Sequence, residues 1–220
     1  MKAILFDFDG TLVDSQHWYD VAISKYLSEF NTKYTHEYCS KFINGRCWYD
    51  AFDIVAKEEG FDKNIILGKA LADAQELIAQ NANVTNGTIE ALDSLDNMGI
   101  MYAICSNASK NEIGFILNKT HLDKYFPSER IFARNMVKNG KPSSDVYLLG
   151  LKSLGLHPSQ TFAVEDSLNG AKASINAEIK TVIFTGSSSF NSKEKFYQEF
   201  GQDTIFFDNM LSVVEYVNNA

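Results

Sequence analysis

From residue 89 onward, apolar segments with strand-like and helix-like spacing alternate along the chain. Strands are expected over residues 101–105, 131–133, 161–164 and 180–184, and helices over residues 89–98, 111–118, 144–154, 170–176 and 190–200. Strands that are separated by helices of this length require crossover connections, which join parallel neighbours. The alternation therefore predicts a doubly wound α/β fold, in which helices cover both faces of a mostly parallel sheet.

The N-terminal residues predict one further strand, which a helical segment separates from the others. The apolar run Ala3 to Phe6 leads into Asp-Phe-Asp-Gly-Thr, where Gly10 suits a tight turn. Between Tyr19 and Gln80 the apolar spacing is helical, and no convincing strand occurs. We expect about four helices in this stretch, inserted between the first strand and the rest of the α/β unit.

The charge balance limits the classes of partner. The 220 residues include 28 acidic and 20 basic side chains, which gives a formal net charge of −8. No block of Lys or Arg interrupts the sequence, and an acidic surface repels polyanions, so we expect neither nucleic acid nor an anionic membrane as a partner. A small anionic substrate would need a local positive site, built from a cation, a metal or helix N-termini.

The cysteines and the N-terminus bear on the cellular setting. Cys39, Cys47 and Cys105 are an odd set without C-x-x-C spacing, which argues against a disulfide framework and against a structural zinc site. The N-terminal residues show neither a signal-peptide pattern nor a membrane-spanning one. The sequence therefore predicts a cytoplasmic protein, and a compact acidic chain of this kind is expected to be a monomer.

Polar residues gather where the predicted strands end. They are Asp7 to Thr11, Ser106-Asn107, Lys141 in a Gly-Lys-Pro turn, and Glu165-Asp166-Ser167. Because ligands of open parallel sheets bind beyond the carboxyl ends of the strands, we expect these places to share one crevice.

The acids of this crevice predict a metal site. Carboxylates from Asp7, Asp9, Glu165 and Asp166 would repel one another at a cost of several kcal/mol unless a cation enters. All of these ligands are oxygen atoms, and oxygen ligands together with substrate phosphate favour magnesium.

Such a crevice suits phosphoryl transfer. With the repulsion between a carboxylate and a phosphate relieved by the metal, Asp7 can attack phosphorus and form an aspartyl-phosphate. Asp9, two residues on, can protonate the leaving oxygen and later activate water. Hydrogen bonds and positive charge for the phosphoryl oxygens are expected from the remaining polar residues, namely the backbone at Gly10 and Thr11, then Ser106, Asn107 and Lys141.

Four motifs in order carry a family resemblance. They are D-F-D-G-T-L-V-D-S from Asp7, S-N from Ser106, G-K-P-S-S-D from Gly140 and V-E-D-S-x-x-G from Val164. This pattern resembles the haloacid dehalogenase superfamily, in particular the branch that includes β-phosphoglucomutase and phosphoglycolate phosphatase. The resemblance spans essentially the whole chain. It implies an α/β core of residues 1–14 and 84–220, and a helical cap of residues 15–83 that closes over the site and selects the substrate.

The resemblance also implies a role for each site residue. Asp7 would be the nucleophile, and Asp9 would be the acid/base residue and a metal ligand through its backbone carbonyl. Ser106 and Lys141 would hold the transferring phosphoryl group. The acids that would surround magnesium are Asp7, Asp9, Asp166 and Glu165, the last of them directly or through water.

Each motif alone also has a plainer interpretation. The first acids could be solvated turn residues, Ser106 could cap a helix, and Lys141 could lie on the surface. The acids at Glu165-Asp166-Ser167 could merely cap the helix that follows. Within the insert, His17 and Gly45-Arg46 are candidates for contact with substrate, against ordinary surface or turn roles.

The predicted activity is magnesium-dependent hydrolysis of a small phosphomonoester, such as a sugar phosphate. The alternative is a phosphosugar mutase of the β-phosphoglucomutase type, which would be expected to carry histidine and arginine where this chain has Tyr19 and Trp48. Relatives that displace halide from carbon lack the acid at Asp9 and need no metal. An inactive binding protein on the same fold would be expected to have lost Asp7, Asp9 or Asp166, and all three are present.

Overall fold

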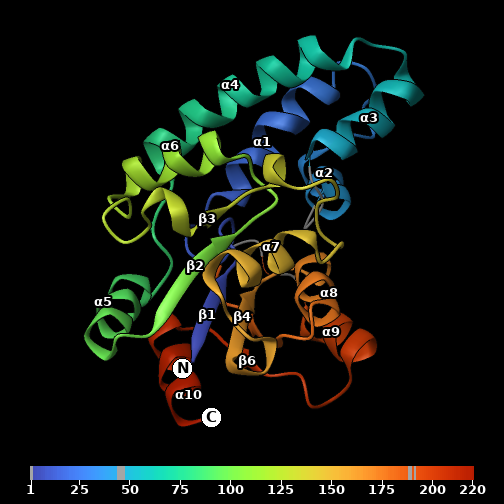
Figure 1. The fold of residues 1–220 in the computed structure, drawn as a ribbon. Coiled ribbons are helices and arrows are strands. Elements are labelled where there is room, and N and C mark those ends of the chain that lie inside the picture. Colours follow the sequence, from blue (N-terminus) through green and yellow to red (C-terminus); the bar gives the residue numbers. More distant parts are fainter. Residues whose placement is uncertain (1, 44–47, 188–189, 191) are drawn as a thin grey trace.

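A parallel sheet forms the centre of the molecule in the computed structural model, which describes residues 2–43, 48–187, 190 and 192–220 (Figure 1). The six strands of the described chain have the order β3-β2-β1-β4-β5-β6, and all neighbouring pairs are parallel. Their bounds are β1 Ala3–Phe6, β2 Met101–Cys105, β3 Ile131–Phe132, β4 Thr161–Glu165, β5 Lys180–Phe184 and β6 Phe206–Phe207. This arrangement confirms the predicted doubly wound α/β fold.

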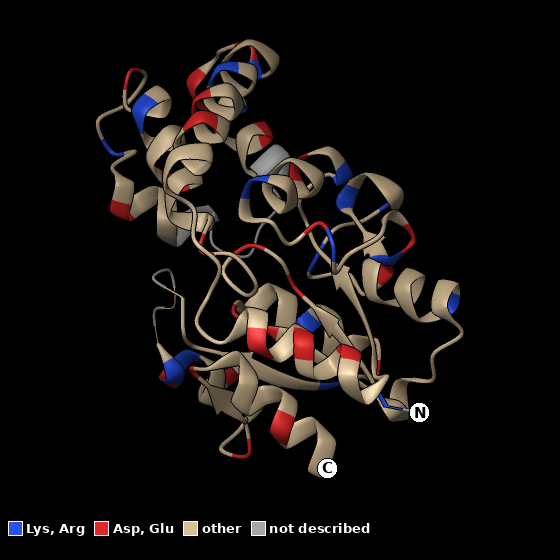
Figure 2. Cartoon of the chain, turned by 90° about the vertical axis from the view of Figure 1, so that its left-hand side faces the viewer, with Lys and Arg blue, Asp and Glu red and all other residues tan. Residues whose placement is uncertain are grey.

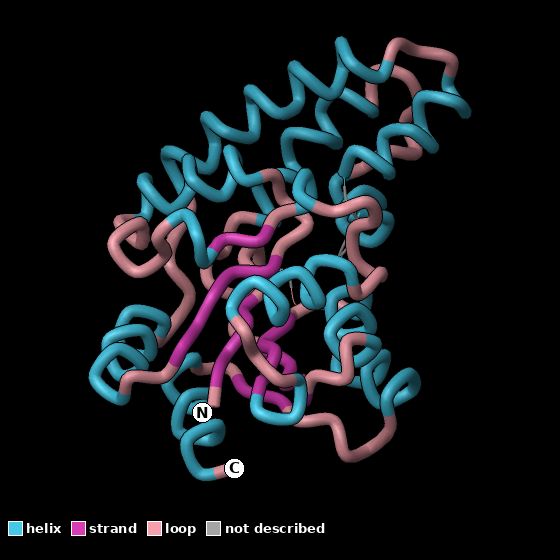
Figure 3. The backbone as a smooth tube through the Cα atoms, viewed as in Figure 1, coloured by secondary structure: helices cyan, strands magenta, loops and turns pink. Residues whose placement is uncertain are grey.

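Helices cover both faces of the sheet (Figure 3). On one face, Ile4 and Phe6 of β1 belong to an apolar cluster that includes side chains of α5 (Thr88–Met98), α6 (Lys110–Thr120) and α10 (Met210–Asn219). On the other face, Leu5 belongs to a second cluster with α7 (Asp145–Leu154) and α8 (Leu168–Asn176). Because side chains of a strand point alternately to the two faces, β1 is buried on both sides.

The helical insert lies beyond one end of the sheet, at the top of Figure 1. It consists of α1 (Gln16–Leu27), α2 (His36–Ile43), α3 (Trp48–Glu59) and α4 (Lys63–Asn81). The number of helices agrees with the prediction, and the described part of this stretch contains no strand. Helices α1 and α4 pack closely because the buried side chains between them are small. These side chains are Ala22 on α1 and Ala70 and Ala74 on α4, all in the common apolar cluster.

The two connections between the insert and the α/β unit run side by side. Val13 and Val84 form an antiparallel bridge, and the N–H of Asp14 donates to the carbonyl of Asn83 over 2.9 Å. The hydroxyl of Thr85 donates to the backbone carbonyl of Thr11 over 2.6 Å, directly beside the first motif. The insert therefore leaves and re-enters the α/β unit at one place, next to the candidate site.

The C-terminal part differs most from expectation. Helix α9 (Lys193–Phe200) begins later than predicted, and β6 and α10 were not predicted. Phe196 of α9 and Phe206 of β6 pack edge to face, with ring centroids 5.9 Å apart, and close this side of the sheet. Three short 3-10 helices occur among the described residues, at Ser128–Arg130, Arg134–Met136 and Pro158–Gln160.

Acidic and basic residues occur along both the α/β unit and the helical insert, as Figure 2 shows. Within the described ranges, none of the helices is both long enough and apolar enough to cross a bilayer. Cys39 and Cys105 are buried free thiols. Cys47 and the candidate pair Gly45-Arg46 lie outside the described residues.

Candidate active site

The candidate site lies at the carboxyl ends of the central strands, where the order in which strands are added to the sheet reverses. Strand β1 has β2 on one side and β4 on the other, and the sheet grows outward from both. Asp7 follows β1, Ser106 follows β2, and Glu165 is the last residue of β4. Doubly wound sheets bind ligands at such a switch point, so the topology brings the polar strand ends to the place where a ligand is expected.

Four buried charged residues meet there: Asp7, Glu165, Asp166 and Lys141, which we call the acidic cluster. The three acids each offer a carboxylate oxygen, and these atoms lie within 4.8 Å of one another. Lys141 Nζ lies 2.6 Å from Asp7 Oδ1 and 2.6 Å from Glu165 Oε1. Lys141 is only 5% exposed, so it is not a surface lysine.

Burial and mutual repulsion shift the ionisation of the cluster. Burial raises the pKa of Glu165 from 4.5 to about 7, although Lys141 acts in the opposite direction. Burial, and then the charges of Asp7 and Glu165, raise the pKa of Asp166 well above its ordinary value. Burial would lower the pKa of Lys141, but the two carboxylates that it contacts outweigh burial and raise it. The cluster is thus an arrangement of acids that need more positive charge than Lys141 supplies.

The donor set of the cluster fits a divalent cation. Three carboxylates and one ammonium group, when ionised, leave a net charge of −2. Among the described residues, Glu165 Oε2 is buried and has no hydrogen-bond partner, which leaves its lone pairs available. Oxygen ligands of this kind suit Mg²⁺, which keeps some water and completes its shell with substrate phosphate. Asp7, Glu165 and Asp166 are the side chains that would hold it.

The carboxylate of Asp9 is not one of the three grouped acids. Ser15 Oγ, at the start of the helical insert, donates a hydrogen bond to Asp9 Oδ1 over 2.5 Å. Burial, with a smaller contribution from the charge of Asp7, raises the pKa of Asp9 from 3.8 to about 7, although the hydrogen bond from Ser15 acts in the opposite direction. A carboxyl group with such a pKa can both give and accept a proton near neutral pH.

The turn after Asp9 does not offer the two backbone donors that the sequence predicts. Gly10 has a φ of 81°, which favours glycine, and its N–H donates to the carbonyl of Val13 over 2.8 Å. The N–H of Thr11 donates to the carbonyl of Phe8 over 3.2 Å. Both groups are engaged in closing the turn, so Gly10 and Thr11 shape the loop that carries Asp9.

The side chain of Asn107 pairs with the backbone of Lys141. Its side-chain oxygen accepts from the N–H of Lys141 over 2.7 Å, and its side-chain nitrogen donates to the Lys141 carbonyl over 3.2 Å. This amide pair holds the backbone of the loop that carries Lys141. It uses one of the two N–H donors of the Asn107 side chain, and the second is available for a phosphoryl oxygen. Gly140 keeps the contact open, since a Cβ there would lie 2.7 Å from Asn107 Oδ1.

Ser106 does not cap a helix. Its Oγ accepts from the N–H of Ala108 over 3.0 Å, and α6 is capped instead by Ser109, which forms a capping box with Glu112. The hydroxyl hydrogen of Ser106 has no acceptor in the part of the chain that the structure describes, so it can donate to a ligand. The capping interpretation holds for Ser167, whose side chain accepts from the N–H of Gly170.

Two residues that contact the cluster were missed in the sequence. The hydroxyl of Tyr147 on α7 donates to Glu165 Oε1 over 2.5 Å, and burial followed by the charge of Glu165 raises its pKa well above the ordinary value. Gly170 on α8 makes room for the same carboxylate, since a Cβ there would lie 1.8 Å from Glu165 Oε2. The final glycine of V-E-D-S-x-x-G was a signal for this close approach, whereas Tyr147 resembled an ordinary core residue of an amphipathic helix.

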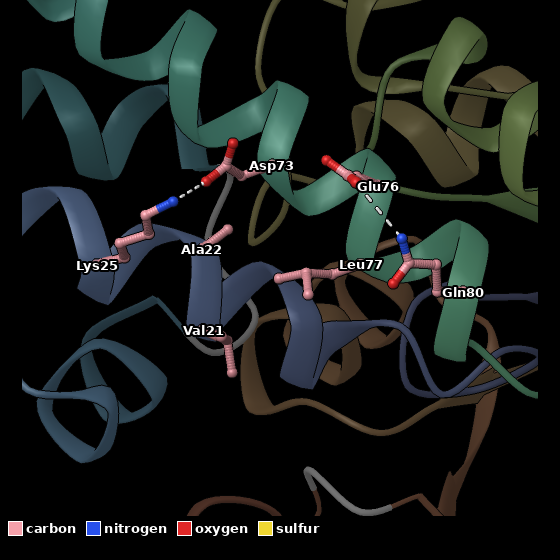
Figure 4. A pocket seen from close by; sticks show the side chains of 7 residues that line it. All are labelled: Val21, Ala22, Lys25, Asp73, Glu76, Leu77 and Gln80. Carbon is pink, nitrogen blue, oxygen red and sulfur yellow. Dashed lines mark hydrogen bonds and ion pairs between the residues drawn. The ribbon is translucent and has the colours of Figure 1, made fainter.

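The helical insert contributes a separate cavity and a group of rings near its start. A cavity of about 400 Å³ lies between α1 and α4, where Lys25 and Asp73 form an ion pair (Figure 4). None of its lining residues belongs to the acidic cluster.

The ring of His17 lies 4.9 Å, centroid to centroid, from each of Trp18 and His36, so this histidine packs with its neighbours in the insert.

Comparison with known proteins relates this geometry to a family. Residues 4–184 match the model of the haloacid dehalogenase-like hydrolases. Among curated relatives, a phosphorylated carbohydrates phosphatase of Thermotoga maritima is 28% identical over 188 residues, covering 83% of this chain and 84% of that protein. The 6-phosphogluconate phosphatase of Escherichia coli is 26% identical, covering 84% of this chain and 82% of that protein.

Solved structures share the fold. A HAD hydrolase of Entamoeba histolytica superposes with a TM-score of 0.81 at 19% identity, over 98% of this chain and 100% of that one. CbbY of Rhodobacter sphaeroides, solved in complex with phosphate, superposes with a TM-score of 0.76 at 21% identity, over 97% of this chain and 96% of that one. The residues that match the family model, 4–184, include all four members of the acidic cluster. The chain therefore belongs to the haloacid dehalogenase-like hydrolase family.

Proposed function

We propose that this protein is a magnesium-dependent phosphatase that hydrolyses a small phosphomonoester, such as a sugar phosphate, through an aspartyl-phosphate on Asp7. The observation that carries the proposal is the buried contact of Asp7 with Lys141, beside Glu165 and Asp166, at the switch point of the sheet. The names of the curated relatives, phosphatases of phosphorylated carbohydrates and of 6-phosphogluconate, support the substrate class.

In this proposal Asp7 is the nucleophile. Its Oδ1 is held by Lys141 Nζ, so its other oxygen attacks phosphorus and a P–O bond forms as the bond to the leaving alcohol breaks. Asp9 donates its proton to the leaving oxygen, which the raised pKa of this carboxyl favours near neutral pH. Asp9 then takes a proton from the water that attacks the aspartyl-phosphate and releases inorganic phosphate, which restores both acids.

The phosphoryl oxygens need donors and positive charge. Ser106 supplies a hydroxyl hydrogen, and Lys141 supplies a charge that Asn107 positions through the backbone of its loop. Magnesium, held by Asp7, Glu165 and Asp166, would neutralise charge on the phosphoryl group and orient it for in-line attack. The backbone carbonyl of Asp9 is a further ligand in the proposal.

The helices α1 to α4 are proposed to act as a cap. We propose that residues 1–14 and 84–220 form the catalytic core and that residues 15–83 form this cap. The paired connections at Val13 and Val84 support a single hinge region, and Ser15 joins Asp9 to the first helix of the cap. Closure would exclude water from the cluster and strengthen its electrostatic interactions.

Hydrolysis is favoured over a mutase reaction. Tyr19, which stands at a spacing where a β-phosphoglucomutase is expected to have histidine, is 2% exposed and belongs to the apolar cluster of the insert. An imidazole can exchange protons with a sugar near neutral pH, whereas a buried tyrosine in this place cannot.

The test uses an aryl phosphate and a panel of phosphorylated metabolites. The wild type is expected to release phosphate with Mg²⁺ and to stop when the cation is chelated, and Asp7→Asn is expected to be inactive. Asp203→Asn, at an exposed position, is the control and should keep full activity. Phosphate release that continues in chelator or in Asp7→Asn would refute the proposal, and interconversion of sugar phosphates without release would favour the mutase.

A further inference from the structure

Two donors meet on one oxygen of Glu165. Lys141 Nζ donates to Glu165 Oε1 over 2.6 Å, and the hydroxyl of Tyr147 donates to the same atom over 2.5 Å. The side chain of Tyr147 is fully buried, and Lys141 Nζ lies 5.1 Å from the centroid of its ring. Tyr147 therefore contacts both the acid and the ammonium group of the cluster.

The second oxygen of Glu165, Oε2, has different surroundings. Oε2 is buried and has no hydrogen-bond partner among the described residues, and it lies against Gly170, where a Cβ would be 1.8 Å away. A buried carboxylate oxygen without a partner costs free energy unless a cation or water occupies it. The two oxygens of Glu165 thus differ sharply, with both donors on one and none on the other.

We propose that Tyr147 is a positioning residue of the cation site: its hydroxyl, together with Lys141, fixes the rotation of the Glu165 carboxylate so that Oε2 is presented to the divalent cation. The inference rests on the cation of the proposed function and adds a residue that does not itself touch the cation. Groups that orient ligands in this way commonly change metal affinity by about 10-fold to 100-fold when they are removed.

An ordinary packing role would involve only the ring of Tyr147. The ring belongs to the apolar cluster with Val146 and Leu151 of the same helix. Tyr147→Phe keeps this ring and removes the hydroxyl alone, so packing and positioning give different results in this variant. Lys141 remains in contact with Glu165 Oε1, which keeps the buried acid partnered and the fold intact.

The matched control is Tyr102→Phe. Tyr102 is also buried, at 1% exposed, and its hydroxyl donates to Asp96 over 2.8 Å, outside the acidic cluster. Both variants and the wild type are titrated with Mn²⁺, followed by its electron paramagnetic resonance signal, and then with Mg²⁺ in competition. Circular dichroism establishes that each protein is folded before titration.

Tyr147→Phe is expected to bind Mn²⁺ about 10-fold or more weakly than the wild type, whereas Tyr102→Phe should bind like the wild type. Excess Mg²⁺ should restore most of the phosphatase turnover of Tyr147→Phe. Equal Mn²⁺ affinity in Tyr147→Phe and the wild type would overturn the positioning role and leave the proposed function standing. The same loss in both variants would also overturn it, and a wild type that binds no divalent cation would remove the proposed function as well.

Discussion

Replacing Asp9 by asparagine separates the chemistry of this side chain from its electrostatic cost. Burial raises the pKa of Asp9 from 3.8 to about 7, and each pKa unit corresponds to about 1.4 kcal/mol. The ionised carboxylate should therefore destabilise the fold by about 4 kcal/mol, or about 2 kcal/mol after allowance for its partial exposure to solvent. Asparagine keeps an oxygen that can accept from Ser15 but carries no charge.

The sign of the pH dependence follows from the two states. Below pH 4 the acid is protonated in both the folded and the unfolded chain, so it imposes no cost. Between about pH 4 and 7 the folded chain holds the proton that the unfolded chain has lost, and stability falls as pH rises. At pH 8 the cost is complete. Asp9→Asn should therefore be more stable than the wild type by about 2 to 4 kcal/mol at pH 8, and by less than half as much at pH 5.

The assay is equilibrium unfolding in urea with chelator present, at pH 5 and pH 8, together with turnover at saturating Mg²⁺. Asp203→Asn, which removes an exposed acid, is the control and should change stability by no more than about 0.5 kcal/mol at either pH. The reasoning fails if Asp9→Asn is no more stable than the wild type at pH 8, or if its gain is the same at both pH values. Retained turnover would show that Asp9 is not the acid/base residue.

Three further results are expected. Lys141→Met should lose activity and should destabilise the metal-free protein by about 3 to 5 kcal/mol, because the buried carboxylates of Asp7 and Glu165 lose the ammonium group that they contact. Urea unfolding measures this change in stability, and an unchanged midpoint would contradict it. Gly170→Ala should weaken Mn²⁺ binding and lower the melting temperature, because its Cβ would displace Glu165. The control is Gly114→Ala, whose added Cβ would have no atom within 4 Å and should stabilise helix α6 by about 0.5 to 1 kcal/mol. Similar melting temperatures for the two variants would refute the close approach at Gly170.

The strands that carry the site are predictable because each is a short apolar run that ends in polar or turn residues. The predicted bounds of β2 and β5 agree with the structure, and β4 extends one residue further, to Glu165. Strand β6 has two residues, Phe206–Phe207, and only its pairing with β5 defines it. Helix α10 buries Val213, Val214 and Val217, a helical spacing from which it could have been predicted.

Within the site, the sequence indicates which residues gather but not how they pair. The acids and Lys141 are predictable because the topology of a parallel sheet brings strand ends together. The pairing of Asn107 with the backbone of Lys141, 34 residues away, depends on the fold of two loops. The contact of Tyr147 with Glu165 depends on the rotation of α7 about its axis. Local patterns carry no information about either contact, so the sequence did not predict that Asn107 holds the Lys141 loop, and Tyr147 was overlooked.

The central claim is that Asp7 is phosphorylated during turnover. Rapid mixing with substrate and Mg²⁺, followed by borohydride reduction, converts an aspartyl-phosphate into homoserine, which peptide mass spectrometry can locate among Asp7, Asp9 and Asp14. Homoserine at position 7 alone, and only when substrate is present, is the predicted result. Full turnover with no reduced residue at position 7, or with reduction at another aspartate, would contradict the mechanism.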